Sequence, residues 1–131
     1  MNPVLLSATL ACAALPAAVF ATDQPPPLPA GMDRDVYCET LVSQVADTQE
    51  KLPDEQKAKH ARLMESVREA ASFYLGSITA RLTDAQMSDF AARADKALAA
   101  ATSDDRATQL QYCLNDATRR AGHYADRVEA N

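Results

Sequence analysis

One repeating pattern fills most of the chain: from Asp33 onward, apolar residues recur every three or four positions, and Pro53 is the only proline. This spacing places the apolar side chains on one face of an α-helix. The sequence contains no strand-like alternation of useful length. The pattern predicts one all-α domain over residues 33–125, with residues 126–131 as a C-terminal tail.

Capping residues and Pro53 divide this region into helices. Asp33 is the expected N-cap of a first helix from about Arg34 to Lys51, which ends because the residue before a proline avoids the helical conformation. Pro53 suits the first turn of a second helix that runs to about Arg81. Such a helix would be roughly 40 Å long. That length is large for so small a domain, so we expect a bend or a break.

The second half of the domain begins with a capping box, in which Thr83 and Gln86 satisfy opposite backbone amides. A third helix should follow. The segment Thr102–Asp105 predicts the cap of a fourth helix, and Gly122 is its expected C-terminal stop. Four amphipathic helices with short connections predict a small antiparallel four-helix bundle.

The apolar stripe of the second helix is the longest and should form much of the core. Its expected members are His60, Met64, Val67, Ala71, Tyr74, Leu75, Ile78 and Leu82.

The N-terminus has the character of a leader. Residues 3–21 carry no charge and end in Val19-Phe20-Ala21, with small residues at the third position before a signal-peptidase cut and immediately before it. We expect residues 1–21 to be a signal peptide, mature protein to begin at Thr22, and residues 22–32 to form a proline-rich spacer. A retained membrane anchor is the alternative, although Pro16 disfavours a spanning helix.

Removal of the leader would remove Cys12 and leave Cys38 and Cys113 as the only cysteines. Two cysteines in an oxidising compartment usually form a bridge. The sequence therefore predicts one disulfide between them, in a periplasmic or secreted protein with no stable membrane insertion after leader cleavage.

Composition excludes several functions. Lys and Arg total 13 against 18 Asp and Glu, Trp is absent, and only three glycines occur, which disfavours nucleic-acid binding and a glycine-rich phosphate loop. His60 and Met64 share a helix face, but a closed metal site needs more ligands. No recognisable set of nucleophile, base and orienting group occurs. We therefore expect no catalytic residue, no metal site and no cofactor.

The segment around Gly76 is the most distinctive. A glycine inside a helix costs about 1 kcal/mol relative to alanine, so it asks for a reason. Ser72, Gly76 and Ala80 are small and four apart, which predicts close packing of a neighbouring helix within the fold. The alternative is a hinge or a binding groove lined by Phe73 and Tyr74.

The leader, Cys38, the central Phe73-Tyr74-Leu75-Gly76 and Cys113 together resemble a group of small uncharacterised bacterial envelope proteins. The likeness covers about residues 37–114 and implies a compartment and a fold, but no chemistry. The chain is also similar in architecture to small periplasmic acid-stress chaperones, whose sequence motifs it lacks.

These observations lead to three hypotheses. The first is a non-enzymatic exported protein that binds other macromolecules or has a structural role in the cell envelope, with an unidentified protein partner or a second copy as a homodimer. The others are an acid-stress chaperone and a carrier of a small molecule or metal.

Overall fold

The computed structural model describes residues 29–129, and the side chains of residues 29–123. Five helices and no strands occur in this part of the chain, which confirms the all-α prediction. In chain order they are α1 (Gly31–Glu50), α2 (Asp54–Lys59), α3 (Ala61–Thr79), α4 (Asp84–Ala100) and α5 (Ser103–Glu129). The expected signal peptide and most of the proline-rich spacer lie outside the described residues. No helix in this part of the chain is long and apolar enough to cross a membrane.

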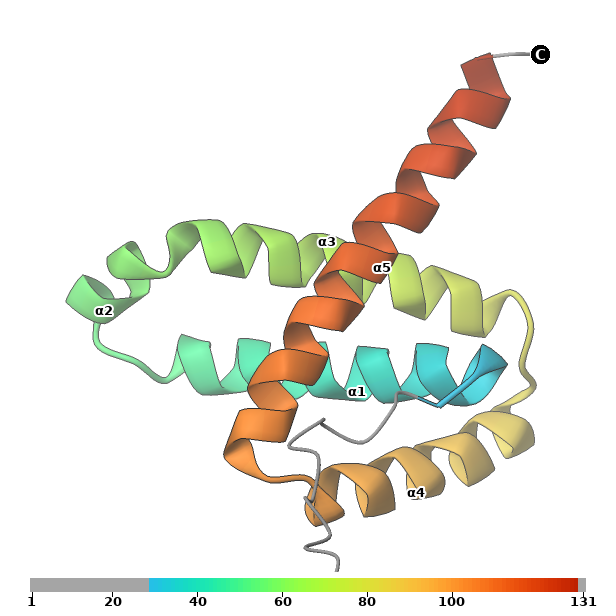
Figure 1. The fold of residues 1–131 in the computed structure, drawn as a ribbon, viewed down its shortest axis with the longest axis horizontal. Helices are drawn as coiled ribbons and strands as arrows, with labels where there is room; N and C mark the ends of the chain where they lie inside the picture. Colours follow the sequence, from blue (N-terminus) through green and yellow to red (C-terminus); the bar gives the residue numbers. More distant parts are fainter. Residues whose placement is uncertain (1–28, 130–131) are drawn as a thin grey trace, which may run out of the picture.

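The helices pack in two layers. Figure 1 shows α1, α3 and α4 side by side, with α1 in the middle. In this layer α3 runs antiparallel to α1, whereas α4 runs in the same direction as α1. The last helix, α5, crosses obliquely over α1 and α3 and packs against both. The regular four-helix antiparallel bundle is therefore not confirmed.

The first helix begins earlier than its capping pattern predicts. Its N-cap is Ala30, which makes no side-chain capping hydrogen bond, and Gly31 has a φ of 61°. That left-handed conformation suits glycine. Asp33, the expected N-cap, lies inside the first turn, and its Oδ1 accepts a hydrogen bond of 2.7 Å from Arg93 Nε on α4. Asp33 therefore joins two helices instead of capping one.

The expected break in the long second helix is confirmed at His60. This residue has a φ of −107° and a ψ of 12°, and it separates α2 from α3. The six residues of α2 include no buried one. Because α2 buries no apolar side chain, nothing in the core holds it in line with α3.

The two capping motifs are confirmed. Thr83 and Gln86 form the complete capping box of α4. At the start of α5, Thr102 Oγ1 accepts a hydrogen bond of 3.1 Å from the amide of Asp105, whose carboxylate accepts one of 3.2 Å from the amide of Thr102. These local bonds set the two turns that bring α4 alongside α1 and then redirect the chain into α5.

The core lies where α1, α3 and α5 meet and extends under α4. Of the expected stripe, Met64, Val67, Tyr74 and Ile78 are buried, and Ala71 and Leu82 are partly buried. Leu75 is 52 % exposed, and His60 is also exposed. The buried apolar residues that form one core cluster are Val36, Tyr37, Cys38, Leu41, Val42, Val67, Ala70, Tyr74, Ile78, Ala94, Leu98, Cys113, Leu114 and Ala117.

The disulfide between Cys38 and Cys113 is present and joins α1 to α5, with 5.5 Å between the Cα atoms. Both cysteines are fully buried. The bridge holds α5 at the point where it crosses α1.

The expected stop at Gly122 is wrong, because α5 continues to Glu129. Among the described glycines only Gly31 has a positive φ, so Gly122 does not take the left-handed conformation that ends helices. In Figure 1 the end of α5 extends away from the other helices.

Candidate functional site

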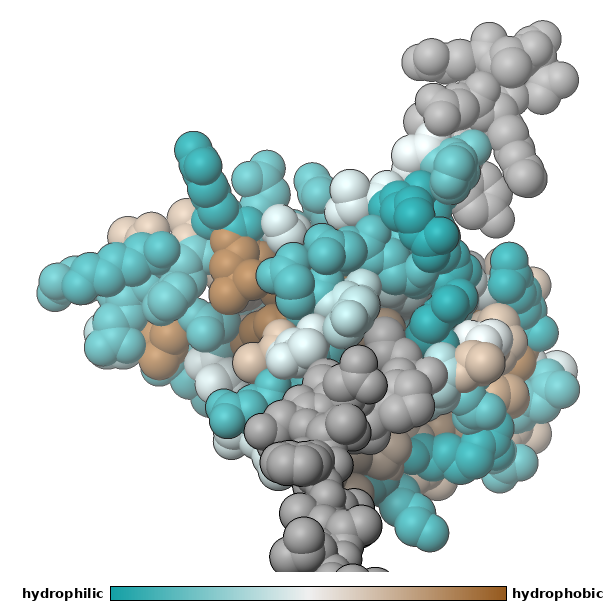
Figure 2. All heavy atoms as spheres, viewed as in Figure 1, coloured by the Kyte–Doolittle hydropathy of each residue, from teal (hydrophilic) through white to brown (hydrophobic). Residues whose placement is uncertain are grey.

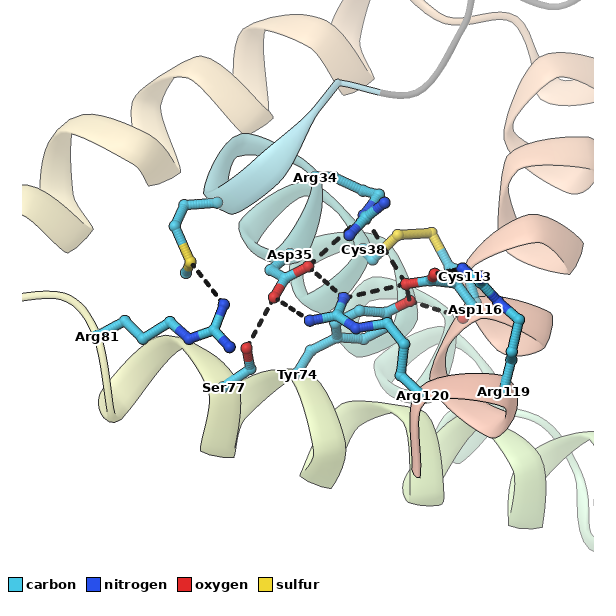
Figure 3. A network of polar contacts seen from close by, with 11 residues as sticks. Arg34, Asp35, Cys38, Tyr74, Ser77, Arg81, Cys113, Asp116, Arg119 and Arg120 are labelled. Atoms are coloured by element: carbon cyan, nitrogen blue, oxygen red, sulfur yellow. Dashed lines mark hydrogen bonds and ion pairs between the residues drawn. A yellow bond between two sulfur atoms is a disulfide. The ribbon is translucent and has the colours of Figure 1, made fainter. Parts of the chain in front are cut away.

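Beside the disulfide, polar side chains from three helices meet in one network, which we call the polar cluster (Figure 3). Helices α1, α3 and α5 all contribute. The members of the polar cluster are Arg34, Asp35, Tyr74, Ser77, Asp116, Arg119 and Arg120.

The pair between Asp35 and Arg120 is the centre of the polar cluster. Arg120 donates to both carboxylate oxygens, from Nη1 to Oδ1 at 2.7 Å and from Nη2 to Oδ2 at 3.0 Å. Ser77 Oγ donates to Oδ2 at 2.7 Å. Asp35 is 1 % exposed and the side chain of Arg120 is 20 % exposed. This two-pronged arrangement is the strongest geometry for a guanidinium and a carboxylate.

Asp116 links the same arginine to the core. Its Oδ2 accepts from Arg120 Nη1 at 3.1 Å and lies 3.0 Å from the Tyr74 hydroxyl, and its Oδ1 accepts from Arg119 Nη2 at 2.8 Å. The Tyr74 hydroxyl also lies 2.8 Å from the carbonyl oxygen of Cys113. Tyr74 therefore connects α3 to the α5 backbone at the disulfide.

The surroundings shift the pKa values of both carboxyl groups downward. Burial raises the pKa of Asp35, but hydrogen bonds from Arg120 and Ser77, with the charges of Arg120 and Arg34, outweigh it. Burial likewise raises the pKa of Asp116, and hydrogen bonds from its neighbours, led by those of Arg119 and Arg120, reverse the effect. Both pKa values fall below the usual 3.8.

The pKa values of Tyr74 and Arg120, by contrast, are shifted upward. The pKa of Tyr74 is raised, first by burial and then by the charge of Asp116. The pKa of Arg120 is raised, chiefly by its hydrogen bond to Asp35. At neutral pH these two groups keep their protons and the two carboxyl groups are ionised. Such extremes suit a fixed ion network, because a group that exchanges protons in catalysis needs a pKa near the working pH.

A second polar contact lies on the other side of the disulfide. The Tyr37 hydroxyl of α1 donates a short hydrogen bond to Gln109 Oε1 of α5, and both residues are buried. The bridge, this contact and the polar cluster together hold α5 against α1 over several turns.

The sequence-predicted segment Phe73-Tyr74-Leu75-Gly76 is divided between two faces of α3. Tyr74 is buried in the polar cluster, and Phe73 is partly buried, with its ring 5.3 Å from that of Tyr74 and beneath the Arg120 guanidinium at 5.0 Å. Gly76 is exposed, and a Cβ built on it would meet nothing within 4 Å. The predicted close helix contact at Gly76 within the fold is therefore wrong. Tyr74 has no exposed surface, so it does not line the alternative binding groove with Phe73.

Sequence reasoning missed Asp35, Asp116 and Arg120. A signal was present on α5, where Asp116 and Arg120 are one turn apart and follow Cys113 on the side that faces the core. Asp35 directly precedes the buried run Val36–Cys38. An acidic residue next to a buried stripe and a basic residue next to another are candidates for a buried pair, since isolated charges are rarely buried.

The two histidines are both exposed, whereas Met64 is buried. His60 is the N-cap of α3 and accepts a backbone hydrogen bond from Met64, but only Met64 is buried, so the two side chains do not share one environment. Among the described side chains, those of residues 29–123, no group of three or more His, Cys, Asp or Glu is placed to hold a metal ion.

Comparison with known proteins gives no match: no protein-family model, no curated protein and no solved structure is similar to the chain. The resemblance to bacterial envelope proteins stays a prediction. The function is therefore inferred from the residues and their geometry.

Proposed function

We propose that the protein is a non-enzymatic, exported helical protein that binds another protein through the exposed face of α3. The observation that carries this proposal is the change from charged to uncharged residues along α3. Its first half presents Glu65, Arg68 and Glu69 to solvent, whereas no charged residue occurs in residues 70–80. We call the exposed part of that uncharged stretch the α3 face; its residues are Ser72, Leu75, Gly76, Thr79 and Ala80.

The α3 face is suited to close contact with another helix. Three of its residues, Ser72, Gly76 and Ala80, are small and one turn apart, and Leu75 offers an exposed apolar side chain. The Thr79 hydroxyl donates to the Leu75 carbonyl at 2.8 Å within the helix, so it needs no outside acceptor. Small residues let two helix backbones approach closely and gain packing contacts. Within the described chain no helix occupies this face, so the helix that packs there would belong to another molecule.

A second copy of the chain is the partner that this face favours first. The whole chain carries a net charge of −5, which opposes self-association. Two α3 faces can meet without placing like charges against each other, because neither contributes a charged residue. A homodimer through α3 is therefore the simplest form of the proposed binding.

Sedimentation equilibrium of the disulfide-bonded protein tests the homodimer. Gly76→Leu should abolish association, because its side chain fills the space that a neighbouring helix would occupy. Gly76→Ala is the matched control: it gives a similar gain in helix propensity but keeps a small residue. If wild-type protein is monomeric, or if both variants associate as the wild type does, the α3 face is not the dimer interface.

Export is supported by the uncharged leader pattern, by the resemblance to envelope proteins and by the disulfide, which is typical of oxidising compartments. Mass spectrometry of the expressed protein should show a chain that begins at Thr22. An intact Met1 in the membrane fraction would instead indicate a retained anchor.

An acid-stress chaperone is a second candidate, and the polar cluster favours it. Protonation of Asp35 and Asp116 would leave Arg120 partly buried without its partners, which should loosen α5 while the disulfide keeps the chain connected. The assay is the solubility of an unrelated acid-denatured protein at pH 2–3 and its release on neutralisation. A compact protein at pH 2 that does not suppress aggregation would exclude this function.

A further inference from the structure

An open hollow of about 440 Å³ lies between the start of α1 and the middle of α5. Arg34 lines it from α1, and Tyr112, Asn115, Asp116 and Arg119 line it from α5; residues 29–30 complete its wall. Its volume is in the range of small-molecule sites. The hollow borders the polar cluster, on the side where Arg34 and Arg119 approach Asp116 (Figure 3).

The residues around the hollow carry more hydrogen-bond donors than the described chain uses. The Arg34 side chain is 31 % exposed, and its Nε lies 3.6 Å from Asp35 and 3.8 Å from Asp116, which makes ion pairs but no hydrogen bond. Arg119 is 67 % exposed and gives one hydrogen bond, to Asp116. Asn115 accepts a hydrogen bond from Gln111 through Oδ1, which leaves its NH₂ group to donate. Donors therefore surround the hollow.

Asp116, the acidic residue that lines the hollow, does not satisfy all of these donors. Both oxygens of Asp116 already accept hydrogen bonds, one from Arg119 and the other from Arg120. The whole polar cluster contains three arginines and two aspartates, so it has one positive charge in excess. This excess lies in a chain with a net charge of −5. The local chemistry therefore favours an anion.

We propose that the hollow binds a small molecule through a carboxylate or phosphate group, held by Arg34 and Arg119. Guanidinium groups match the planar arrangement of anionic oxygens and pair with them in two-pronged fashion. The Asn115 amide adds a neutral donor, and Tyr112, which is 58 % exposed, offers an aromatic surface to the rest of the ligand. The site uses residues of α1 and α5, so it stands apart from the proposed α3 interface and does not depend on it.

Titration of the full disulfide-bonded protein with sodium succinate or sodium phosphate, followed by two-dimensional ¹H–¹⁵N NMR, tests the site. Sodium chloride keeps the ionic strength constant, because exposed charges respond to salt alone. Saturable shifts should centre on the amides of Arg34, Tyr112, Asn115 and Arg119. The two probes distinguish a carboxylate ligand from a phosphate ligand. A carboxylate site should saturate at a lower concentration of succinate than of phosphate, and a phosphate site should show the reverse.

Arg119→Gln and Arg34→Gln should each weaken the binding about tenfold, the effect of losing one hydrogen bond to a charged group. Arg93→Gln is the matched control, because it removes an equal charge from an exposed ion pair with Asp33. Arg119 is largely exposed, so Arg119→Gln should leave the fold intact. It therefore tests binding even if Arg34→Gln disturbs the fold. The proposal is overturned if neither anion gives saturable shifts at these residues, or if Arg93→Gln weakens the binding as much as Arg119→Gln does.

Discussion

Replacing Asp35 by leucine should destabilise the protein by about 3 kcal/mol. The substitution removes three hydrogen bonds, two from Arg120 and one from Ser77. Loss of one partner of a buried ion pair costs about 3–5 kcal/mol, because the other charge stays uncompensated. The lower end applies here, since Arg120 is 20 % exposed and keeps a hydrogen bond to Asp116.

Urea unfolding followed by circular dichroism measures this loss, and thermal unfolding gives an independent value. For a domain of this size, 3 kcal/mol corresponds to a fall of about 12–24 °C in the midpoint. Arg120→Met alone should also be costly. The double variant should lose less than the sum of the two single variants, because it leaves neither charge without its partner.

The matched control is Asp33→Leu, which breaks the exposed Asp33–Arg93 pair of the same 2.7 Å length. Exposed pairs contribute about 1 kcal/mol or less. If Asp35→Leu costs no more than Asp33→Leu, or if the double variant costs the full sum, then the buried pair does not stabilise the fold in the way described.

Three further predictions concern the bridge, α3 and pH. Replacing Cys38 and Cys113 by serine should lower the free energy of unfolding by about 4.5 kcal/mol for a separation of 75 residues, and two reactive thiols in the unreduced, denatured protein would contradict the bridge. Gly76→Ala should raise it by about 1 kcal/mol, because the new methyl meets nothing within 4 Å; a loss in urea unfolding would argue against an exposed Gly76. Because the folded pKa values of Asp35 and Asp116 are lowered, the stability from the polar cluster should be complete above about pH 5 and should decrease below about pH 4, as the carboxyl groups protonate. Urea midpoints from pH 7 to pH 2 should therefore fall less steeply for Asp35→Leu, and an unchanged slope would contradict this origin.

Local chemistry explains why much of the fold could be predicted from the sequence. Thr83 bonds with Gln86, and Thr102 bonds with Asp105. The partners are three residues apart, so each pair can be recognised as a short motif in the sequence. The disulfide could be predicted because the expected loss of the leader leaves only two cysteines. The oblique path of α5 could not, since it depends on contacts such as Arg120 with Asp35, which are 85 residues apart.

The site was predicted only in part, because the sequence does not show which residues of α3 face solvent. Periodicity places Tyr74 correctly in the core, but Leu75 next to it faces solvent, because the stripe is narrower than its apolar residues suggest. A glycine within a helix suggests close packing, yet the sequence alone does not show whether Gly76 faces the core or solvent. Only the placement of α1 and α5 shows that the small residues face outward.

The bridge between Cys38 and Cys113 also closes a covalent ring that includes all the residues between them, and α2 is a helix of that ring with no buried residue. A protease that cuts within a ring opens it but releases no fragment. A cut at α2 would therefore leave α1 and α5 joined through sulfur, with the core contacts of α3 on the same molecule. Because α2 has no buried residue, a single cut there should also disturb few core contacts.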